Sequence, residues 1–204
     1  MFKLFDFFRK NPQGATLRNA YLDEHGYYLA QEKKKPLRAD GHSTPVIPYV
    51  VFDLLKNKLD KDFSAFIRWD IYSYRWALHT FKHTSSCRIG LKKKSNGNHR
   101  HFVRDGEKTI EELTQYSHEH EKRFDLILFD GPEKNESASL ICSMIKDSGV
   151  IVMTDDFNDP YDFEQALEQC SKAGFKSLKL TNPAPMFDSL TAAVLYKPDN
   201  FLNI

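Results

Sequence analysis

Two apolar runs of the chain end abruptly in carboxylates. Residues 124–129 are followed by Asp130, and residues 150–154 are followed by Asp155 and Asp156. Short, continuously apolar runs are typical of strands that are buried on both faces of a parallel sheet. Ligands of such sheets bind beyond the carboxyl ends of the strands. The pattern therefore predicts that the three carboxylates lie together at one cleft.

Strands and helices alternate along most of the sequence. Apolar residues recur at helical spacing in residues 49–59, which predicts an amphipathic helix there. Further helices are expected at 72–81, 109–121, 137–146 and 160–173, and strands at 63–69, 87–91, 101–104, 124–129, 150–154, 175–181 and 189–196. A loop with prolines joins the last two strands. Strands alternate with helices, and the chain ends with two consecutive strands. This order predicts a three-layer α/β fold.

The N-terminal region differs in character from the rest. Residues 1–45 are interrupted by glycine and proline, so we expect an irregular or helical arm there and one domain over 46–204. Residues 1–10 are aromatic but charged, and too short for a signal peptide or a membrane span. We expect them to form a short helix docked on the domain or on a partner, and the cytoplasm to be the location.

Composition narrows the choice of partners. Of the 204 residues, 41% are apolar and 28% are charged, which is ordinary for a globular protein. The formal charge of +1 and two short lysine runs, at 33–35 and 92–94, give no reason to expect nucleic acid. The three cysteines have no close-pair spacing, which argues against a disulfide framework or a zinc site; Cys87 and Cys142 are expected to be buried thiols.

The layout from about residue 45 to 204 resembles a class I S-adenosylmethionine-dependent methyltransferase. The matching segments are 124–131, 148–156, 174–175 and the tail from 191 to 204, together with an Ile47-Pro-Tyr49 segment like that of one bacterial subgroup. The resemblance implies a Rossmann-like, mostly parallel seven-stranded sheet that ends in an antiparallel hairpin. It is more specific for fold than for activity.

The cofactor loop departs from the pattern of that family. The family carries roughly Glu-x-Gly-x-Gly-x-Ser after the first strand, because glycines let the backbone pass close to the cofactor. Here the segment is Ile67-Arg-Trp-Asp-Ile-Tyr-Ser73. Ile67 stands at the position of the acid, Trp69 and Ile71 stand at the glycine positions, and only Ser73 matches. A Trp at a glycine position fills volume that the ligand needs.

Other cofactor contacts are also altered. After the next strand, where the family usually has an acid for the ribose hydroxyls, residues 90–94 are apolar and then basic. Asp105 is left as a contact for adenine. An aromatic stripe offers two interpretations: it packs in the core, or its first two members fill the vacated cofactor pocket. The stripe consists of Trp69, Tyr72, Tyr74 and Trp76.

The acidic cluster also has two interpretations. In the metal-dependent branch of the family, Mg²⁺ or Ca²⁺ held by carboxylates orients the hydroxyls of the acceptor. The resemblance places Asp130, Asp155 and Asp156 as metal ligands and catalytic residues, with Asn158 as a further oxygen ligand. Alternatively, Asp155 and Asp156 cap the next element, and Asp130 holds an Asp-Gly turn.

Several histidines are closely spaced. His79 and His83 lie four residues apart, and two pairs are spaced by one residue. A spacing of four on a helix can place two zinc ligands on one face, but no further ligand motif accompanies it. We expect all six to be surface residues: His79, His83, His99, His101, His118 and His120.

These patterns favour a methyltransferase-like protein whose S-adenosylmethionine-binding loop is degenerate. Such a protein would be a non-catalytic pseudoenzyme or an interaction module with an unidentified protein partner. The alternative is an active, divergent O-methyltransferase, with or without a metal, that acts on a small-molecule or saccharide acceptor. A third possibility is a metal-dependent activity of another kind in the same cleft.

Overall fold

The structure is a computed structural model that covers most of the chain. It describes residues 18–204 apart from 69, 90–98, 105–108 and 156–158, and for 87–89, 99–104 and 109–113 it describes the backbone alone. The predictions about residues 1–10, Trp69, Asp105, Asp156 and Asn158 therefore lie outside the described residues.

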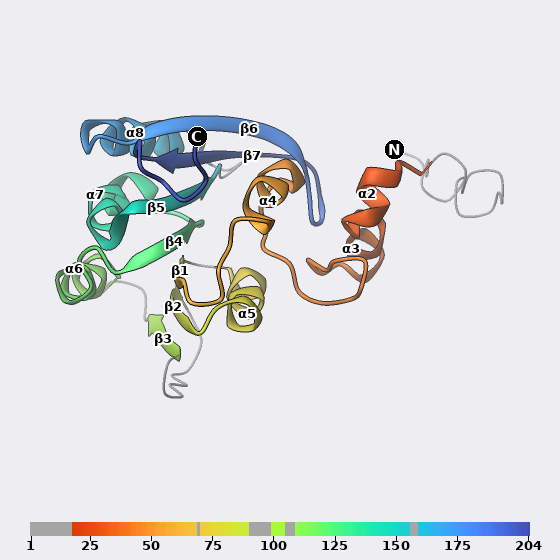
Figure 1. The fold of residues 1–204 in the computed structure, drawn as a ribbon, viewed down its shortest axis with the longest axis horizontal. Helices are drawn as coiled ribbons and strands as arrows, with labels where there is room; N and C mark the ends of the chain where they lie inside the picture. Colours follow the sequence, from red (N-terminus) through yellow and green to blue (C-terminus); the bar gives the residue numbers. More distant parts are fainter. Residues whose placement is uncertain (1–17, 69, 90–98, 105–108, 156–158) are drawn as a thin grey trace.

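One seven-stranded sheet runs through the centre of the molecule, in the order β3-β2-β1-β4-β5-β7-β6 (Figure 1). Five of these strands are parallel, and β7 pairs antiparallel with both β5 and β6. The strands are β1 (Ser64–Arg68), β2 (His83–Ile89), β3 (His99–Arg104), β4 (Phe124–Phe129), β5 (Ile145–Thr154), β6 (Lys176–Ala184) and β7 (Phe187–Tyr196). This arrangement confirms the predicted α/β fold with a mostly parallel sheet and a C-terminal antiparallel hairpin.

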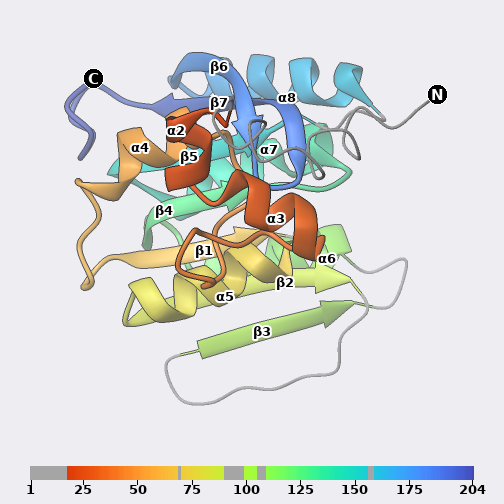
Figure 2. The same cartoon turned by 90° about the vertical axis from the view of Figure 1, so that its right-hand side faces the viewer.

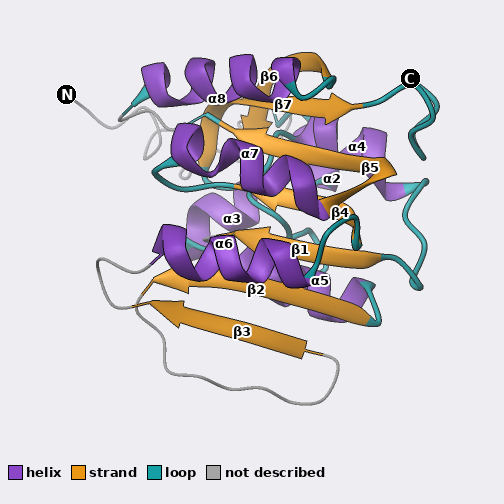
Figure 3. Ribbon diagram, turned by 90° about the vertical axis from the view of Figure 1, so that its left-hand side faces the viewer, coloured by secondary structure: helices purple, strands orange, loops and turns teal. Residues whose placement is uncertain are grey.

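Helices cover both faces of the sheet. Helices α4 (Tyr49–Lys56) and α5 (Ile71–Thr80) lie on one face (Figure 2), and α6 (Thr109–Glu119), α7 (Lys134–Met144) and α8 (Pro160–Lys172) lie on the other (Figure 3). Successive residues of a strand point to opposite faces. In β4, Leu126 and Leu128 therefore pack against α4 and α5, while Ile127 and Phe129 pack against α7 and α8. Burial on both faces explains why the strand lacks polar alternation.

Several element boundaries differ from those expected from sequence, and three of the differences have a clear physical reason. β2 begins at His83 rather than Cys87, because its polar first residues pair in register with β1. Helix α7 ends at Met144, and Ile145, predicted to be helical, already pairs with Phe124 of β4. Pro183, which was expected in a loop, lies inside β6. This strand is at the edge of the sheet, and its pairing with β7 shifts register between Asn182 and Ala184, so the proline lies at an irregularity where its missing N–H is tolerated.

The N-terminal arm contains two short helices, α2 (Ala20–Glu24) and α3 (Tyr27–Lys33), on the same side of the sheet as α4 and α5 (Figure 2). The Tyr27 hydroxyl of α3 donates to the carboxylate of Asp188 in the β6–β7 hairpin, which extends toward this helix (Figure 1). None of the helices in the described part of the chain is long and apolar enough to cross a membrane.

Candidate functional site

The carboxyl ends of β1, β4 and β5 meet at one edge of the sheet. Arg68 is opposite Phe129 in the register of β1 and β4, and Phe129 is opposite Met153 in that of β4 and β5. Asp130 and Asp155 therefore follow adjacent strands, as expected. The Thr154 hydroxyl donates to Asp130 Oδ1 over 2.5 Å. The backbone N–H of Asp155 donates to the carbonyl oxygen of Thr191 over 2.9 Å, which ties this end of β5 to β7.

Burial raises the pKa of Asp130 above its ordinary value. Hydrogen bonds from Thr154 and from the Gly131 N–H, together with the charge of Lys134, act in the opposite direction, and the neighbouring Asp70 raises the pKa further. The net direction is upward because the surrounding protein removes most of the water that would solvate the carboxylate. Asp130 thus retains its proton to a higher pH than an ordinary aspartate does.

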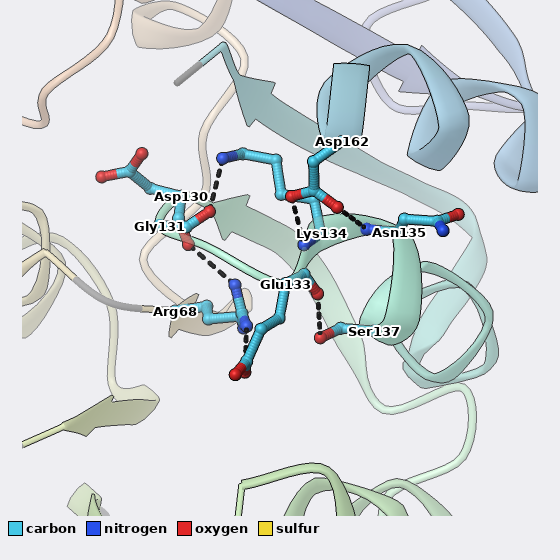
Figure 4. Close-up of polar contacts among 8 residues, drawn as sticks. All are labelled: Arg68, Asp130, Gly131, Glu133, Lys134, Asn135, Ser137 and Asp162. Atoms are coloured by element: carbon cyan, nitrogen blue, oxygen red, sulfur yellow. Dashed lines mark hydrogen bonds and ion pairs between the residues drawn. The ribbon is translucent and has the colours of Figure 1, made fainter. Parts of the chain in front are cut away.

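Arg68 is a member of the site that the sequence analysis missed. Its side chain is only 3% exposed; it donates through Nη1 to the carbonyl oxygen of Asp130 over 3.1 Å, and Nη2 lies 3.8 Å from Glu133 Oε2 (Figure 4). The guanidinium carbon also lies 5.1 Å from the centre of the Phe129 ring. An arginine that ends the apolar run of β1 was the available signal, since a buried guanidinium requires partners of this kind.

The loop after β4 brings further polar groups together (Figure 4). Lys134 has no exposed surface, and its ammonium group donates to the carbonyl oxygen of Gly131. Glu133 adopts a left-handed conformation, with φ of 61°, and its side chain does not cap α7. Instead, Asp162 of α8 accepts hydrogen bonds from the backbone N–H groups of Lys134 and Asn135, both at 2.8 Å.

The turn from β1 to α5 is the segment at which the sequence resemblance places the cofactor loop. Asp70 caps α5 by accepting from the N–H groups of Tyr72 at 3.2 Å and Ser73 at 2.5 Å. Ser73 is buried, and its hydroxyl oxygen accepts from the N–H of Val46 at 3.0 Å. Ile67 packs in the apolar core against α4 and α5. The hydrogen-bonding groups described at this turn are therefore bound to the chain itself.

Other residues of the predicted cofactor site are placed as follows. Ile71 is the first residue of α5 and is half-buried. Tyr72 is also half-buried, with the Arg75 guanidinium 5.7 Å from its ring. Trp76 packs edge-on against Phe81 in the core, so the core interpretation holds for this member of the aromatic stripe.

No group of three or more histidine, cysteine or acidic residues in the described part of the chain is arranged to hold a metal ion. Of the predicted ligands, Asp130 and Asp155 are described, while Asp156 and Asn158 are not. One oxygen of Asp130 already accepts from Thr154. A raised pKa also makes Asp130 a weaker ligand, because hard cations bind the ionised carboxylate.

The expectation that all six histidines lie at the surface is wrong for His120. Its ring stacks on Tyr116 with centroids 3.8 Å apart, and its Nδ1 is 2.9 Å from the carbonyl oxygen of Tyr116. His79 and His83 are exposed, but His79 belongs to α5 and His83 begins β2, so they do not share a helix face. His118 is exposed, and the side chains of His99 and His101 are outside the described part.

A small cavity of about 120 Å³ lies between the N-terminal arm and α4. None of the predicted cofactor or metal site residues that the structure describes lines it. The lining residues are Glu24, His25, Arg38, Thr44, Tyr49, Phe52 and Lys56.

Comparison with known proteins identifies the fold. No protein-family model matches the sequence. No curated protein matches it either. Among solved structures, a spermidine synthase in complex with the transition-state analogue AdoDATO is similar, with a TM-score of 0.52 and 13% identity over 71% of this chain and 58% of that one. Spermidine synthase from Thermotoga maritima is similar as well, with a TM-score of 0.51 and 14% identity over 71% of this chain and 57% of that one.

A third similar structure is the MycE methyltransferase from the mycinamycin biosynthetic pathway, in complex with Mg, SAH and mycinamycin VI. Its TM-score is 0.50, at 12% identity over 73% of this chain and 45% of that one. The chain thus spans less than two thirds of the length of these structures. Identities this low establish the fold alone. The fold is of the class I methyltransferase type, as the sequence resemblance implied.

Proposed function

We propose that this protein is a methyltransferase-like module that has lost S-adenosylmethionine-dependent catalysis and functions by binding a protein partner. The observation that carries the proposal concerns the turn after β1. There, the polar groups of Asp70, Tyr72 and Ser73 form hydrogen bonds within the chain. The Asp70 carboxylate accepts from the N–H groups of Tyr72 and Ser73, and the hydroxyl oxygen of Ser73 accepts from the N–H of Val46. A cofactor that used any of these groups would have to displace the hydrogen bond that the group now makes.

The charge at this edge supports the same conclusion. The methyl donor is a sulfonium cation, for which an acidic residue at the end of the first strand is a favourable neighbour. Here Ile67 occupies that position and packs in the core, and the next residue is the buried cation Arg68. The guanidinium of Arg68 is held by the carbonyl oxygen of Asp130 and by Glu133, so it does not turn away easily.

Isothermal titration of the full chain with S-adenosylmethionine and S-adenosylhomocysteine, each with and without Mg²⁺, tests the proposal. We expect no saturable heat and no shift of the melting temperature with either ligand. An active class I methyltransferase titrated in the same buffers provides the positive control. Saturable binding in the micromolar range, by either ligand, would refute the loss of cofactor binding.

One observation favours a second function, that of an active and metal-assisted O-methyltransferase on a small-molecule or saccharide acceptor. Burial raises the pKa of Asp130 at the carboxyl end of β4, which is a property of general acids and bases. In this case Asp130 would take the proton of the acceptor hydroxyl, and Asp155 and Asp156 would help to hold Mg²⁺ or Ca²⁺. The similar MycE structure contains Mg and SAH. Under this hypothesis S-adenosylmethionine binds, and Asp130→Asn leaves its binding intact while abolishing methyl transfer.

A further inference from the structure

Two cysteines that are far apart in sequence meet between α7 and α8. The Sγ atoms of Cys142 and Cys170 lie 3.3 Å apart. We propose that this pair is an oxidation site, at which a disulfide oxidant such as oxidised glutathione forms an intramolecular disulfide that joins the two helices. The spacing of 28 residues matches no cysteine motif, so the pair could not be expected from the sequence.

The geometry brings the two sulfurs close to bonding distance. A disulfide bond is about 2.05 Å long, so the sulfur atoms need to approach by roughly 1.3 Å. The two helices are already held together by other contacts. Asp162 of α8 accepts from the N–H groups at the start of α7, and Gln169 Nε2 donates to Asn135 Oδ1 over 2.6 Å. Side-chain adjustment in a preformed contact is therefore the main change required.

Burial determines the order of the chemical steps. Cys142 is partly exposed and Cys170 is fully buried, so the oxidant reaches Cys142 first. The Cys142 thiolate attacks one sulfur of oxidised glutathione, the S–S bond of the oxidant breaks, and one glutathione thiolate leaves. The Cys170 thiolate then attacks Cys142 Sγ and displaces the second glutathione. Two cysteine thiols are oxidised, one glutathione disulfide is reduced, and the two thiol protons end on the two glutathione thiols.

The same surroundings make the reaction slow at neutral pH. The hydrogen bond to Cys170 and burial both raise the pKa of the Cys142 thiol, while Lys197 acts in the opposite direction. Since the thiolate is the attacking species, its scarcity limits the rate. Oxidation should accelerate as the pH rises, and the pair should respond to sustained rather than brief oxidation.

The test uses the full chain, first reduced and then incubated with oxidised glutathione at alkaline pH. Trypsin cleaves after lysine and arginine, so Cys142 falls in peptide 135–146, Cys170 in peptide 147–172 and Cys87 in peptide 83–88. We expect a linked peptide made of 135–146 and 147–172, and an intact mass lower by two hydrogen atoms. The melting temperature should rise by roughly 5–10 °C, because the bond restricts the unfolded chain.

Three serine variants make the assignment specific. Cys142→Ser and Cys170→Ser should each abolish the linked peptide and the thermal shift, and Cys87→Ser, the matched control, should retain both. Cys142 is partly exposed, so its serine variant is expected to fold even if Cys170→Ser does not. A glutathione adduct that persists on Cys142, a linkage that contains peptide 83–88, or thiols that stay reduced under these conditions would each overturn the proposal.

Discussion

Asp130 shows how one side chain responds to the loss of solvent. Burial raises its pKa, and the Thr154 hydroxyl and the Gly131 N–H only partly compensate. A carboxyl group whose pKa is higher in the folded state binds its proton more tightly there. Its contribution to stability is therefore complete below the unfolded value, near 3.8, and is lost as the pH rises through the folded value.

Asp130→Asn should therefore leave the free energy of unfolding at pH 7 unchanged or raise it. In the variant, the free energy of unfolding should decrease less between pH 4 and neutral pH than it does in the unmodified chain. Asparagine keeps an oxygen acceptor for Thr154 and removes the ionisable group. Thr154→Val is the complementary variant, because it removes the hydroxyl that donates to Asp130. It should lower the free energy of unfolding at pH 7 by roughly 1–3 kcal/mol. Denaturant unfolding at a series of pH values measures both. A loss of several kcal/mol in Asp130→Asn would mean that the carboxylate is ionised in the folded chain and stabilised by the charge of Lys134.

At the scale of elements, α7 depends on a residue of another helix. Its first N–H groups are not capped by Glu133, which precedes the helix in a left-handed conformation. The cap comes from Asp162, in the first turn of α8. No local pattern could have shown this arrangement, because the usual cap residue immediately precedes its own helix. The cap therefore couples the loop after β4, with Lys134 in it, to the start of α8.

Asp162→Ala should lower the free energy of unfolding by about 1–2 kcal/mol, since it leaves two N–H groups at the start of α7 without their acceptor. Glu168→Ala on the same helix is the control. Its ion pair with Lys172 is exposed to solvent and should contribute much less to stability. Chemical denaturation of the two variants compares the effects, and equal losses would argue that Asp162 acts only as a surface charge.

At the scale of the whole molecule, Asp53 of α4 anchors the N-terminal arm. It accepts hydrogen bonds from the Tyr21 hydroxyl at 2.8 Å and from His25 Nε2 at 2.8 Å, and Lys56 Nζ lies 2.7 Å away. Burial acts to raise the pKa of Asp53, but the contacts with Lys56, His25 and Tyr21 outweigh it and lower the pKa. The stabilisation is therefore present above the ordinary value of 3.8 and is lost as the pH falls through the lower folded value.

Asp53→Asn should loosen the arm without unfolding the sheet. Hydrogen exchange of residues 20–33 should increase by at least about tenfold at neutral pH, as for the loss of a charged hydrogen bond worth roughly 1.5 kcal/mol or more. In the unmodified chain, protection of the arm should fall below about pH 4, and the variant should lack this pH dependence. Asp23→Asn, which alters an exposed ion pair with Arg18, is the control and should change little. Increased exchange in β4 and β5 would instead indicate global destabilisation.

The sequence by itself determined the order of strands and helices and the fold class. Apolar runs such as 124–129 and 150–154 record burial on both faces, which is a local property of the chain. The sequence also placed Asp130 and Asp155 at the carboxyl edge of the sheet, because the direction of the strands follows from their alternation with helices. Pro183 was misjudged because its place on an edge strand, at a shift of register between β6 and β7, depends on strand pairing that the local sequence does not show.

Tertiary structure alone decided which polar groups are paired. Arg68 and Glu133 are far apart in sequence, as are Ser73 and Val46, and Cys142 and Cys170, and only the packing of separate elements joins them. Periodicity reports whether a residue is buried, whereas the partner of a buried polar group depends on contacts that no local pattern records. The sequence thus indicated carboxylates at this edge of the sheet, and the structure showed that polar groups of its described residues, such as Arg68 and Asp130, are hydrogen-bonded within the chain.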